Sequence, residues 1–328
     1  LGACVLGGVR SVTSLSIKYS TDRKQFGVSI NTFGAIKSKL AEMATKIFAT
    51  ESLCYRAGQD IEDRMVALAQ EGLPDAEAKL KALEQFAIEA AIAKVHGSEV
   101  LDYVVDQGVQ IYGGMGYSAD APMERAYRDA RISRIYEGTN EINRMLMVGM
   151  VLKRAMKGEI NLFEPAMAVA AELTSVPSFE SIDASELFAV EKDILKKLKK
   201  VFLMVGGKAA MSLQDRIEDE QEIMMNLADV MIEIYAAESA ILRAEKIALK
   251  DGEESAKNQI AMAKIYLYEA TDKIGASAKE AIVSFAKGDE QKVLLMGLKR
   301  FTKPDFINVK ELRRQVADYM IAQGKYPF

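Results

Sequence analysis

The segment FGAIKSKLAEMATKIFATESLCYRAGQDIEDRMVAL, residues 33–68, decides the fold. Its apolar residues recur at spacings of three, four or seven, which is the period of an amphipathic α-helix. At about 1.5 Å per residue, such a helix spans roughly 54 Å. A helix of that length needs several partners to cover its apolar face, so the pattern predicts a helical bundle. The periodic residues are Phe33, Ile36, Leu40, Met43, Ile47, Cys54, Ile61, Met65 and Leu68.

The same pattern returns 187 residues later (223 − 36 and 243 − 56). Polar residues return with it, since Glu51 and Arg56 correspond to Glu238 and Arg243. Two unrelated amphipathic helices can share an apolar period without sharing polar residues, so duplication is favoured over convergence. The full set is Ile36, Leu40, Ala41, Glu42, Ile47, Phe48, Ala49, Glu51, Ser52, Arg56 and Ala57, which return as Ile223, Leu227, Ala228, Asp229, Ile234, Tyr235, Ala236, Glu238, Ser239, Arg243 and Ala244.

The residues between the two copies predict a linker. Residues 158–183 contain Pro165, Pro177 and several Ser and Thr residues, which interrupt a helical period. We therefore expect a first helical domain at 1–157, a linker at 158–183 and a second helical bundle at 184–328. The second bundle is predicted to be a degenerate, non-catalytic copy of the first.

The rest of the first domain is also helical in pattern. Helical period runs through residues 1–20, 76–111 and 141–157, and a shorter helix begins near Pro122, a residue suited to a first helical turn. Residues 21–30 are predicted to form a loop, and no segment alternates as a strand requires. The fold class is therefore predicted to be all-α, a four-helix bundle followed by a second, related bundle.

Composition excludes several classes of protein. The chain has 328 residues, of which 49% are apolar and 27% charged, and its net charge of −4 argues against nucleic acid as the main partner. No apolar stretch is long enough to span a bilayer. Cys4 and Cys54 are too few for a disulfide framework and are expected to be buried free thiols. His96 is the only histidine, so no metal site is expected, and a packing or helix-surface role is predicted for it.

The first residues, LGACVLGGV, contain neither an initiator Met nor a basic leader, so they do not read as a signal peptide. Helical period is already established in them and continues toward Arg23. We therefore expect the chain to be a fragment of a longer polypeptide.

Glu137 lies where one helical period stops and another starts, in RISRIYEGTNEINR at residues 131–144. Thr139 or Asn140 can cap the helix that follows. We expect Glu137 to lie in a cleft between helices. From these residues alone, a plain interhelical turn is the alternative, because Gly and a cap are common in such turns.

A second break is the glycine turn QIYGGMGY, residues 110–117. Its three glycines lack Cβ atoms, which lets main-chain N–H groups approach a phosphate or sugar closely. The turn follows a helix rather than a strand, so it is neither a dinucleotide fingerprint nor a P-loop. In TDRKQFG, residues 21–27, the polar side chains can bind an anion or a nucleotide, and a solvated turn is the alternative.

Together, these segments resemble one family. TDRKQFG at 21–27, QIYGGMGY at 110–117 and RDARISRIYEGT at 128–139 occur in the order and approximate spacing of the acyl-CoA dehydrogenase C-terminal helical domain. The likeness spans residues 1–157. It implies an FAD-dependent oxidoreductase that converts acyl-CoA thioesters to trans-2-enoyl-CoA in fatty acid β-oxidation.

This reaction needs a base at the carbon next to the thioester carbonyl and an acceptor for the electrons, and a carboxylate and a flavin meet both needs. The resemblance makes Glu137 the catalytic base and places Gly138 against the substrate. Desolvation by the acyl chain and the flavin is expected to raise the pKa of the base toward the working pH. Backbone N–H groups of the loop, including that of Glu137, can polarise the thioester carbonyl.

The resemblance also implies FAD-binding residues. Arg23 and Phe26 match the family's loop that meets the FAD of a neighbouring subunit. Two residues depart from the family's pattern. Many members carry Gln in place of Glu141, and several carry Gln in place of Gly34. Gln110, Ile111, Tyr112, Gly113 and Gly114 match the stretch that contacts the adenosine end of that FAD, and Thr139, Asn140 and Glu141 match the residues beside the flavin of the same site.

The insertion at 72–79, the segment 85–91 and the second bundle look most like the very-long-chain branch, which implies a long acyl chain. The family's N-terminal helical domain and central β-domain have no counterpart in this sequence, so the fragment alone is expected to be inactive and to bind no flavin. The resemblance implies an electron-transfer flavoprotein as partner and a homodimer or homotetramer. We expect a cytoplasmic location in a bacterium and a mitochondrial one in a eukaryote.

Two other functions remain open. One is a non-catalytic helical oligomerisation module derived from this family, in which the site is unused. The other is a protein that docks on a membrane surface through residues 158–183 and the cationic residues 192–200, for which a solvated helix face is the alternative. The intact Glu137 motif favours the enzyme.

Overall fold

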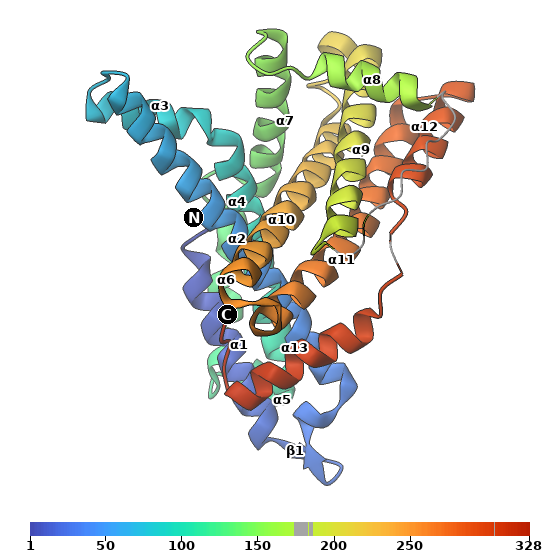
Figure 1. Cartoon of the computed structure of the whole chain (residues 1–328). Coiled ribbons are helices and arrows are strands. Elements are labelled where there is room, and N and C mark those ends of the chain that lie inside the picture. Colours follow the sequence, from blue (N-terminus) through green and yellow to red (C-terminus); the bar gives the residue numbers. More distant parts are fainter. Residues whose placement is uncertain (174–182, 184–185, 305) are drawn as a thin grey trace. The chain divides into compact units, whose positions relative to one another are not determined.

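The computed structural model of the chain describes residues 1–173, 183, 186–304 and 306–328. These residues form thirteen α-helices, three short 3-10 helices and one two-stranded hairpin (Figure 1). The predicted all-α class is confirmed. Over the described ranges, no helix is long and apolar enough to cross a membrane.

The contacts of the chain define two compact units. Unit 1 contains residues 1–140, 239–266 and 307–328, and unit 2 contains residues 141–238 and 267–306. Each unit therefore draws on more than one stretch of sequence, whereas the predicted domains are continuous. Part of the predicted linker, residues 174–182, lies outside the described residues, and the division of the sequence at 158–183 stays a prediction.

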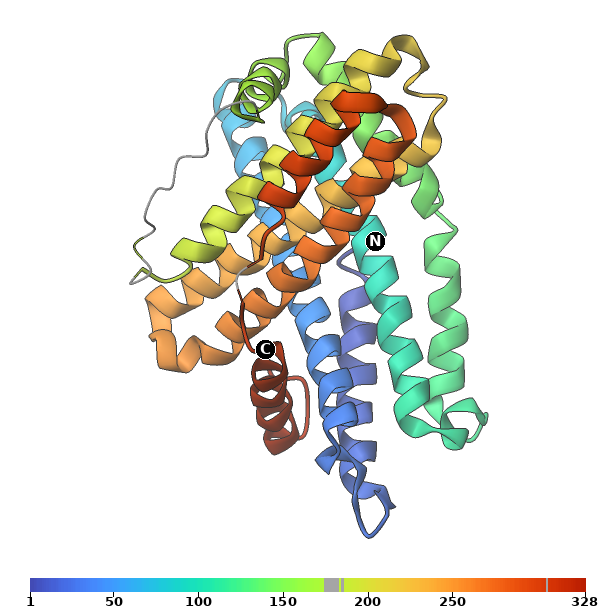
Figure 2. The same ribbon diagram turned by 90° about the vertical axis from the view of Figure 1, so that its right-hand side faces the viewer.

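Unit 1 is built on α1 (Val5–Asp22), α2 (Gly34–Gln70) and α4 (Ala87–Tyr112), which pack against one another. α13 (Val309–Gln323), near the end of the chain, packs beside α2 (Figure 2). The remaining elements of this unit are η1 (Ile30–Thr32), α3 (Asp75–Gln85), α5 (Gly114–Tyr117), α6 (Pro122–Arg131) and η2 (Ile132–Arg134).

The core of unit 1 follows the period of α2, whose residues Leu40, Met43, Ile47 and Phe48 are all 0% exposed. α1, α4 and α6 meet at Gly108 of α4. A Cβ atom on Gly108 would lie 2.9 Å from both Val12 Cγ1 and Met123 Sδ. A larger residue at this point in α4 would therefore require the side chains of Val12 and Met123 to shift.

Two local predictions for unit 1 were wrong. The predicted loop at 21–30 contains a hairpin, in which β1 (Lys24–Gln25) pairs with β2 (Val28–Ser29). Its turn is possible because Phe26 and Gly27 both adopt positive φ, 54° and 84°, as a tight two-residue turn requires. The predicted helix at 76–111 is divided at Phe86 into α3 and α4. The division allows α3 to pack Ala78 and Ala82 against Leu68 of α2.

Unit 2 contains α7 (Asn140–Met156) from its second residue onward, α8 (Phe163–Leu173), α9 (Ala189–Leu213), η3 (Gln214–Arg216) and α12 (Gly288–Phe301). α10 (Gln221–Asp251) and α11 (Glu253–Phe285) contribute residues to both units. α10 begins at Gln221 and α2 at Gly34, an offset of 187 (221 − 34) that equals the sequence repeat. The structural equivalence of the two bundles stays a prediction.

α8 lies within the predicted linker at 158–183. The run AMAVAAEL favours a helix, and Pro165 is tolerated because it lies in the first turn. Glu172, at the end of α8, binds Lys200 of α9 at 2.6 Å and Arg300 of α12 at 3.2 Å. Residues 163–173 are therefore an integral helix of unit 2.

Candidate functional site

Glu137 lies on the loop between η2, which ends at Arg134, and α7, which begins at Asn140. Glu137 has φ 55° and Gly138 has φ 80°, so two successive residues are left-handed. A non-glycine residue in this region carries strain of about 1–3 kcal/mol, which persists only where the surroundings enforce it. The backbone at Glu137 is therefore held in place by other contacts.

The side chain of Glu137 is exposed. The location of Glu137 in a cleft between helices stays a prediction. Its apolar chain neighbours Ile132, Ile135 and Tyr136 are also exposed, by 53%, 47% and 44%. A carboxylate that follows exposed apolar residues in the chain suits a ligand that would cover both.

Residues of α4 hold the end of this loop. The Lys94 Nζ atom donates to the Gly138 carbonyl and to Asn140 Oδ1, each at 2.7 Å. Asn140 Nδ2 donates to Ser98 Oγ at 3.0 Å and to Glu99 Oε1 at 3.1 Å. Thus Asn140, predicted as a possible helix cap, uses its side chain to bind α4, and Lys94, Ser98 and Asn140 are all buried.

A second contact joins the other side of the loop to the same helix. Arg134, the last residue of η2, pairs with Asp102 of α4 at 2.8 Å. Sequence reasoning missed all four residues of α4 that hold the loop. The available signal was polar residues on an otherwise apolar face, since Lys94 and Ser98 are four residues apart and share one side of the helix.

The glycine turn lies at the far end of α4. Gly113 has φ 59° and ψ −139°, a conformation that favours glycine, and it separates α4 from α5. A Cβ atom added to Gly113 or Gly114 would meet no described heavy atom within 4 Å. The backbone here is open to approach by a ligand, and its contact with a phosphate or sugar stays a prediction.

The five predicted residues of this turn do not play equal parts. Gln110, Gly113 and Gly114 are exposed, whereas Ile111 is 3% exposed and belongs to the core, so its side chain cannot reach a ligand. Tyr112 stacks on Tyr19 of α1 at 3.9 Å between ring centroids, and burial raises the pKa of its hydroxyl. The side chains of Ile111 and Tyr112 therefore stabilise the turn, and ligand contacts are left to its glycine backbone and Gln110.

The hairpin presents the other predicted contacts. Arg23 follows α1 directly, its N–H donating to Tyr19 O at 2.8 Å, and its side chain is exposed. Phe26 is 92% exposed at the tip of the hairpin. Because Tyr19 contacts both Arg23 and Tyr112, the structure brings the hairpin base and the glycine turn together.

The structure keeps the glycine turn apart from the Glu137 loop. Lys94, which holds the loop, and Tyr112, at the turn, are 18 residues apart on one helix (112 − 94), so about 27 Å of α4 separates them. Within one chain the predicted residues therefore form two clusters. That the turn serves the cofactor of a neighbouring subunit stays a prediction.

The remaining candidates have ordinary explanations. In the described part of the chain, no group of three or more His, Cys, Asp and Glu residues could hold a metal ion. His96 is buried and contacts Thr50 Oγ1 at 3.1 Å and Tyr266 Oη at 2.8 Å, which confirms a packing role. Burial raises the pKa of the Cys54 thiol to about 11. Cys4 is exposed, so its predicted burial was wrong, because it precedes the first turn of α1.

Two stretches of the chain match family models. Residues 1–152 match "Acyl-CoA dehydrogenase, C-terminal domain", and residues 197–300 match a second model with the same description. A probable acyl-CoA dehydrogenase of Bacillus subtilis is 39% identical over 326 residues, which cover 99% of this chain and 54% of that protein. The chain belongs to the acyl-CoA dehydrogenase family.

Two further acyl-CoA dehydrogenases extend the comparison. A crystal structure of an acyl-CoA dehydrogenase complexed with FAD from Bacillus anthracis superposes with a TM-score of 0.93 at 38% identity, covering 100% of this chain and 55% of that one. The very long-chain specific mitochondrial enzyme of Rattus norvegicus is 28% identical over 320 residues, covering 92% of this chain and 45% of that protein. The chain thus spans about half the length of the relatives it matches.

All of the predicted site residues lie in the acyl-CoA dehydrogenase match at 1–152, and none lies in the match at 197–300. The first match therefore contains both clusters, the Glu137 loop and the hairpin with its glycine turn. The roles of the individual residues in this acyl-CoA dehydrogenase chain stay predictions.

Proposed function

We propose that this chain is the C-terminal part of an FAD-dependent acyl-CoA dehydrogenase that converts acyl-CoA thioesters to trans-2-enoyl-CoA in fatty acid β-oxidation. The observation that carries the proposal is Glu137, an exposed carboxylate on a left-handed backbone that buried residues of α4 hold in place. Strained backbone conformations are concentrated at functional sites, so a strained backbone at an exposed carboxylate favours a functional role for that carboxylate.

In this reaction Glu137 takes a proton from the carbon next to the thioester carbonyl, and its own backbone N–H is placed to polarise that carbonyl. The acyl chain would cover Ile132, Ile135 and Tyr136, exclude water from the carboxylate and so favour its protonated form. Gly138, which has no side chain, leaves room for the substrate. The bound FAD supplies an acceptor for the hydride that leaves the β-carbon.

The residues of this chain that would hold FAD belong to two sites. Thr139, Asn140 and Glu141 would lie beside the flavin of the same active site. Arg23, Phe26 and the glycine turn would contact the adenosine end of a second FAD, bound mainly by another subunit. The separation of the two clusters along α4 supports this division, which requires a homodimer or homotetramer.

A long acyl chain is the proposed substrate, supported by the 28% identity to a very long-chain specific enzyme over 92% of this chain. We further propose an electron-transfer flavoprotein as the electron acceptor. A bacterial protein of this kind would be cytoplasmic and a eukaryotic one mitochondrial. Residues 1–328 alone would associate with themselves yet remain colourless and inactive, because the family encloses the flavin ring with its β-domain.

The test uses the full polypeptide that contains this chain. Purified protein should carry FAD, and palmitoyl-CoA or a longer thioester should bleach the flavin under anaerobic conditions while a product two mass units lighter appears. A series of thioesters from butyryl-CoA upward then assigns chain length. A folded, self-associating protein that holds no FAD and leaves every thioester unchanged would instead support the oligomerisation module.

A further inference from the structure

Lys94 is a lysine in the interior of unit 1. Its side chain is only 5% exposed, and its neighbours along α4 include the buried residues Ile92, Ala93 and Val95. Lysine is almost never fully buried unless its ammonium group is paired, because removing the charge from water is costly. The position of this ammonium group therefore needs a specific explanation.

The contacts of Lys94 supply one. Its Nζ atom lies 2.7 Å from the Gly138 carbonyl oxygen and 2.7 Å from Asn140 Oδ1. These acceptors lie on either side of Thr139, so one ammonium group holds two points of the loop that follows Glu137. An ammonium can do this because it offers three donors, and hydrogen bonds from a charged donor are stronger than neutral ones.

The acceptors are themselves fixed. Asn140 Oδ1 also accepts from Ser98 Oγ at 3.2 Å, and Asn140 Nδ2 donates to Glu99 Oε1 at 3.1 Å. Three side chains of α4 therefore converge on Asn140, the first residue of α7. They are those of Lys94, Ser98 and Glu99. The Gly138 carbonyl, which this cluster binds, belongs to the residue that directly follows Glu137.

The backbone of Glu137 requires such an anchor. Glu137 and Gly138 have φ 55° and 80°, and a non-glycine residue leaves the left-handed region unless its neighbours prevent it. Loss of the bond to the Gly138 carbonyl would let the adjacent peptide rotate and carry the Glu137 carboxylate with it. A displacement of about 1 Å at a reacting group is enough to lower a rate about 100-fold.

We propose that Lys94 is a positioning residue, whose buried ammonium group holds the peptide that follows Gly138 and thereby aims the Glu137 carboxylate at the substrate. The proposal rests on the proposed function of Glu137 and deepens it. Lys94 does not touch the substrate in this account and does not exchange a proton with it.

The alternative is a structural role, in which Lys94 only joins α4 to the start of α7. Lys39 provides a matched control, because its Nζ atom also joins two helices, α2 and α4, through a bond of 2.5 Å to Gln107 Oε1 on a half-buried side chain. Lys39 lies outside both clusters of predicted site residues. A general loss of helix packing would lower kcat in both Lys94→Met and Lys39→Met. A displaced Glu137 carboxylate would lower kcat only in Lys94→Met.

The experiment compares Lys94→Met, Lys39→Met and Glu137→Gln in the full FAD-containing enzyme. For Lys94→Met we expect kcat to fall by about 100-fold with KM within about threefold and FAD content unchanged. The deuterium isotope effect with an α-deuterated acyl-CoA should rise, because proton abstraction becomes slower than the other steps. Peptides that cover residues 132–140 should exchange amide hydrogen faster. Lys39→Met should keep kcat within about twofold.

Each outcome has a defined meaning. Retained turnover in Glu137→Gln overturns the proposed function itself. An inactive Glu137→Gln enzyme together with an undiminished kcat in Lys94→Met overturns only the role of Lys94. If Lys94→Met fails to fold, Lys94→Gln, which keeps an N–H donor, is measured in its place, and a wild-type kcat in it overturns the proposal. Failure of both variants to fold, with Lys39→Met intact, assigns Lys94 a structural role and also overturns it.

Discussion

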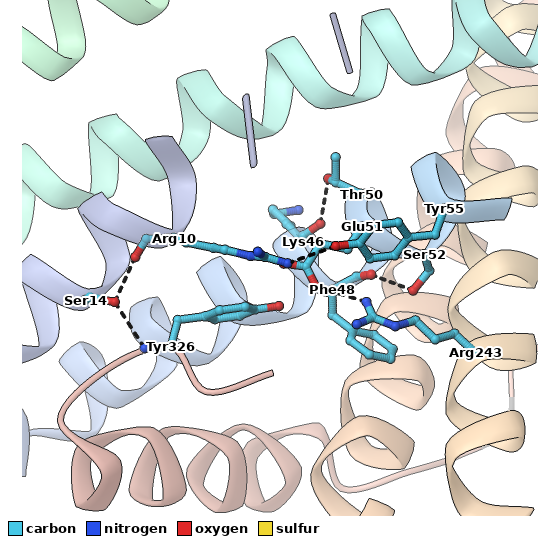
Figure 3. Close-up of polar contacts among 10 residues, drawn as sticks. All are labelled: Arg10, Ser14, Lys46, Phe48, Thr50, Glu51, Ser52, Tyr55, Arg243 and Tyr326. Carbon is cyan, nitrogen blue, oxygen red and sulfur yellow. Dashed lines mark hydrogen bonds and ion pairs between the residues drawn. The ribbon is translucent and has the colours of Figure 1, made fainter. Parts of the chain in front are cut away.

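Glu51 and Glu137, both in unit 1, lie in opposite surroundings. Glu51, in the middle of α2, is 0% exposed and lies between two guanidinium groups, with Oε1 2.6 Å from Arg10 Nε and Oε2 2.9 Å from an Arg243 nitrogen (Figure 3). Glu137 is exposed and lies on a strained loop. Both oxygens of Glu51 are occupied by donors, so that carboxylate cannot act as a base. Glu137 differs from it in exposure and in backbone conformation.

The surroundings of Glu51 serve stability. The Arg243 guanidinium stacks over the rings of Phe48 and Tyr55, 4.7 and 5.3 Å from their centroids. The hydrogen bond to Glu51 raises the pKa of Arg10 above its already high ordinary value, so this guanidinium stays charged. A buried charge that is fully paired holds helices together, whereas the chemical role of the strained, exposed Glu137 is the proposal to be tested. The comparison therefore separates two roles of one residue type.

The largest expected effect on stability is that of Glu51→Gln. The variant leaves two guanidinium groups without their counter-charge, which costs about 3 kcal/mol at a buried pair and lowers the thermal midpoint by roughly 5–10 °C. Differential scanning calorimetry checks this. Glu137→Gln, the matched control at an exposed position, should change stability by less than about 0.5 kcal/mol. Equal stability of Glu51→Gln and wild type would remove the contrast between the two carboxylates.

A smaller effect is expected at the glycine turn, where the backbone is again left-handed. Gly113→Ala places a Cβ at φ 59°, which should cost about 1–3 kcal/mol. Gly114→Ala is its control, since Gly114 begins α5 at an ordinary φ, and it should be neutral or stabilising by about 0.4–1 kcal/mol. Urea denaturation monitored by circular dichroism measures both. Similar losses in both variants would show that the turn is not strained at Gly113.

Sequence reasoning predicted the helical architecture because apolar period is a local property. The same reasoning placed Glu137, Asn140 and the glycine turn at breaks between helices, and these breaks exist. It could not predict that Lys94 and Ser98 hold the Glu137 loop. Those contacts join residues 42–46 positions apart, and no local pattern encodes such a pairing.

The differences between prediction and structure have similar causes. The Phe26-Gly27 turn was predicted as loop because its strands are only two residues long, below the length at which alternation can be detected. α8 was predicted as linker because Pro165 and the residues after Leu173 outweighed a short Ala-rich run. Burial of Cys4 was inferred from the apolar period around it, but the residues at the start of α1 are only partly covered.

The smallest expected effect concerns Tyr326, which lies beside Glu51 and Arg10 (Figure 3). Its backbone N–H donates to Ser14 Oγ at 3.2 Å, and its side chain is buried. Burial raises the pKa of this hydroxyl well above its ordinary value of 10.0. The unfolded chain therefore releases the proton first, and stability should fall as the pH rises above 10.

Tyr326→Phe removes both the buried hydroxyl and its titration. We expect a change of at most about 1 kcal/mol at neutral pH and a flatter loss of stability at alkaline pH. Thermal midpoints measured from pH 7 upward test this, with Tyr319→Phe, on a side chain that is 40% exposed, as the control. A wild-type alkaline slope in Tyr326→Phe would assign the titration to another group.

The central claim, that Glu137 is the base of this site, is tested most directly by the rate at which an acyl-CoA reduces the bound flavin in a single anaerobic turnover. Wild-type and Glu137→Gln enzymes are compared in the full polypeptide at equal FAD content and equal thermal midpoint. We expect a rate at least about 1000-fold lower in Glu137→Gln, within the range for loss of a general base. A rate within tenfold of wild type would contradict it and assign the base to another residue.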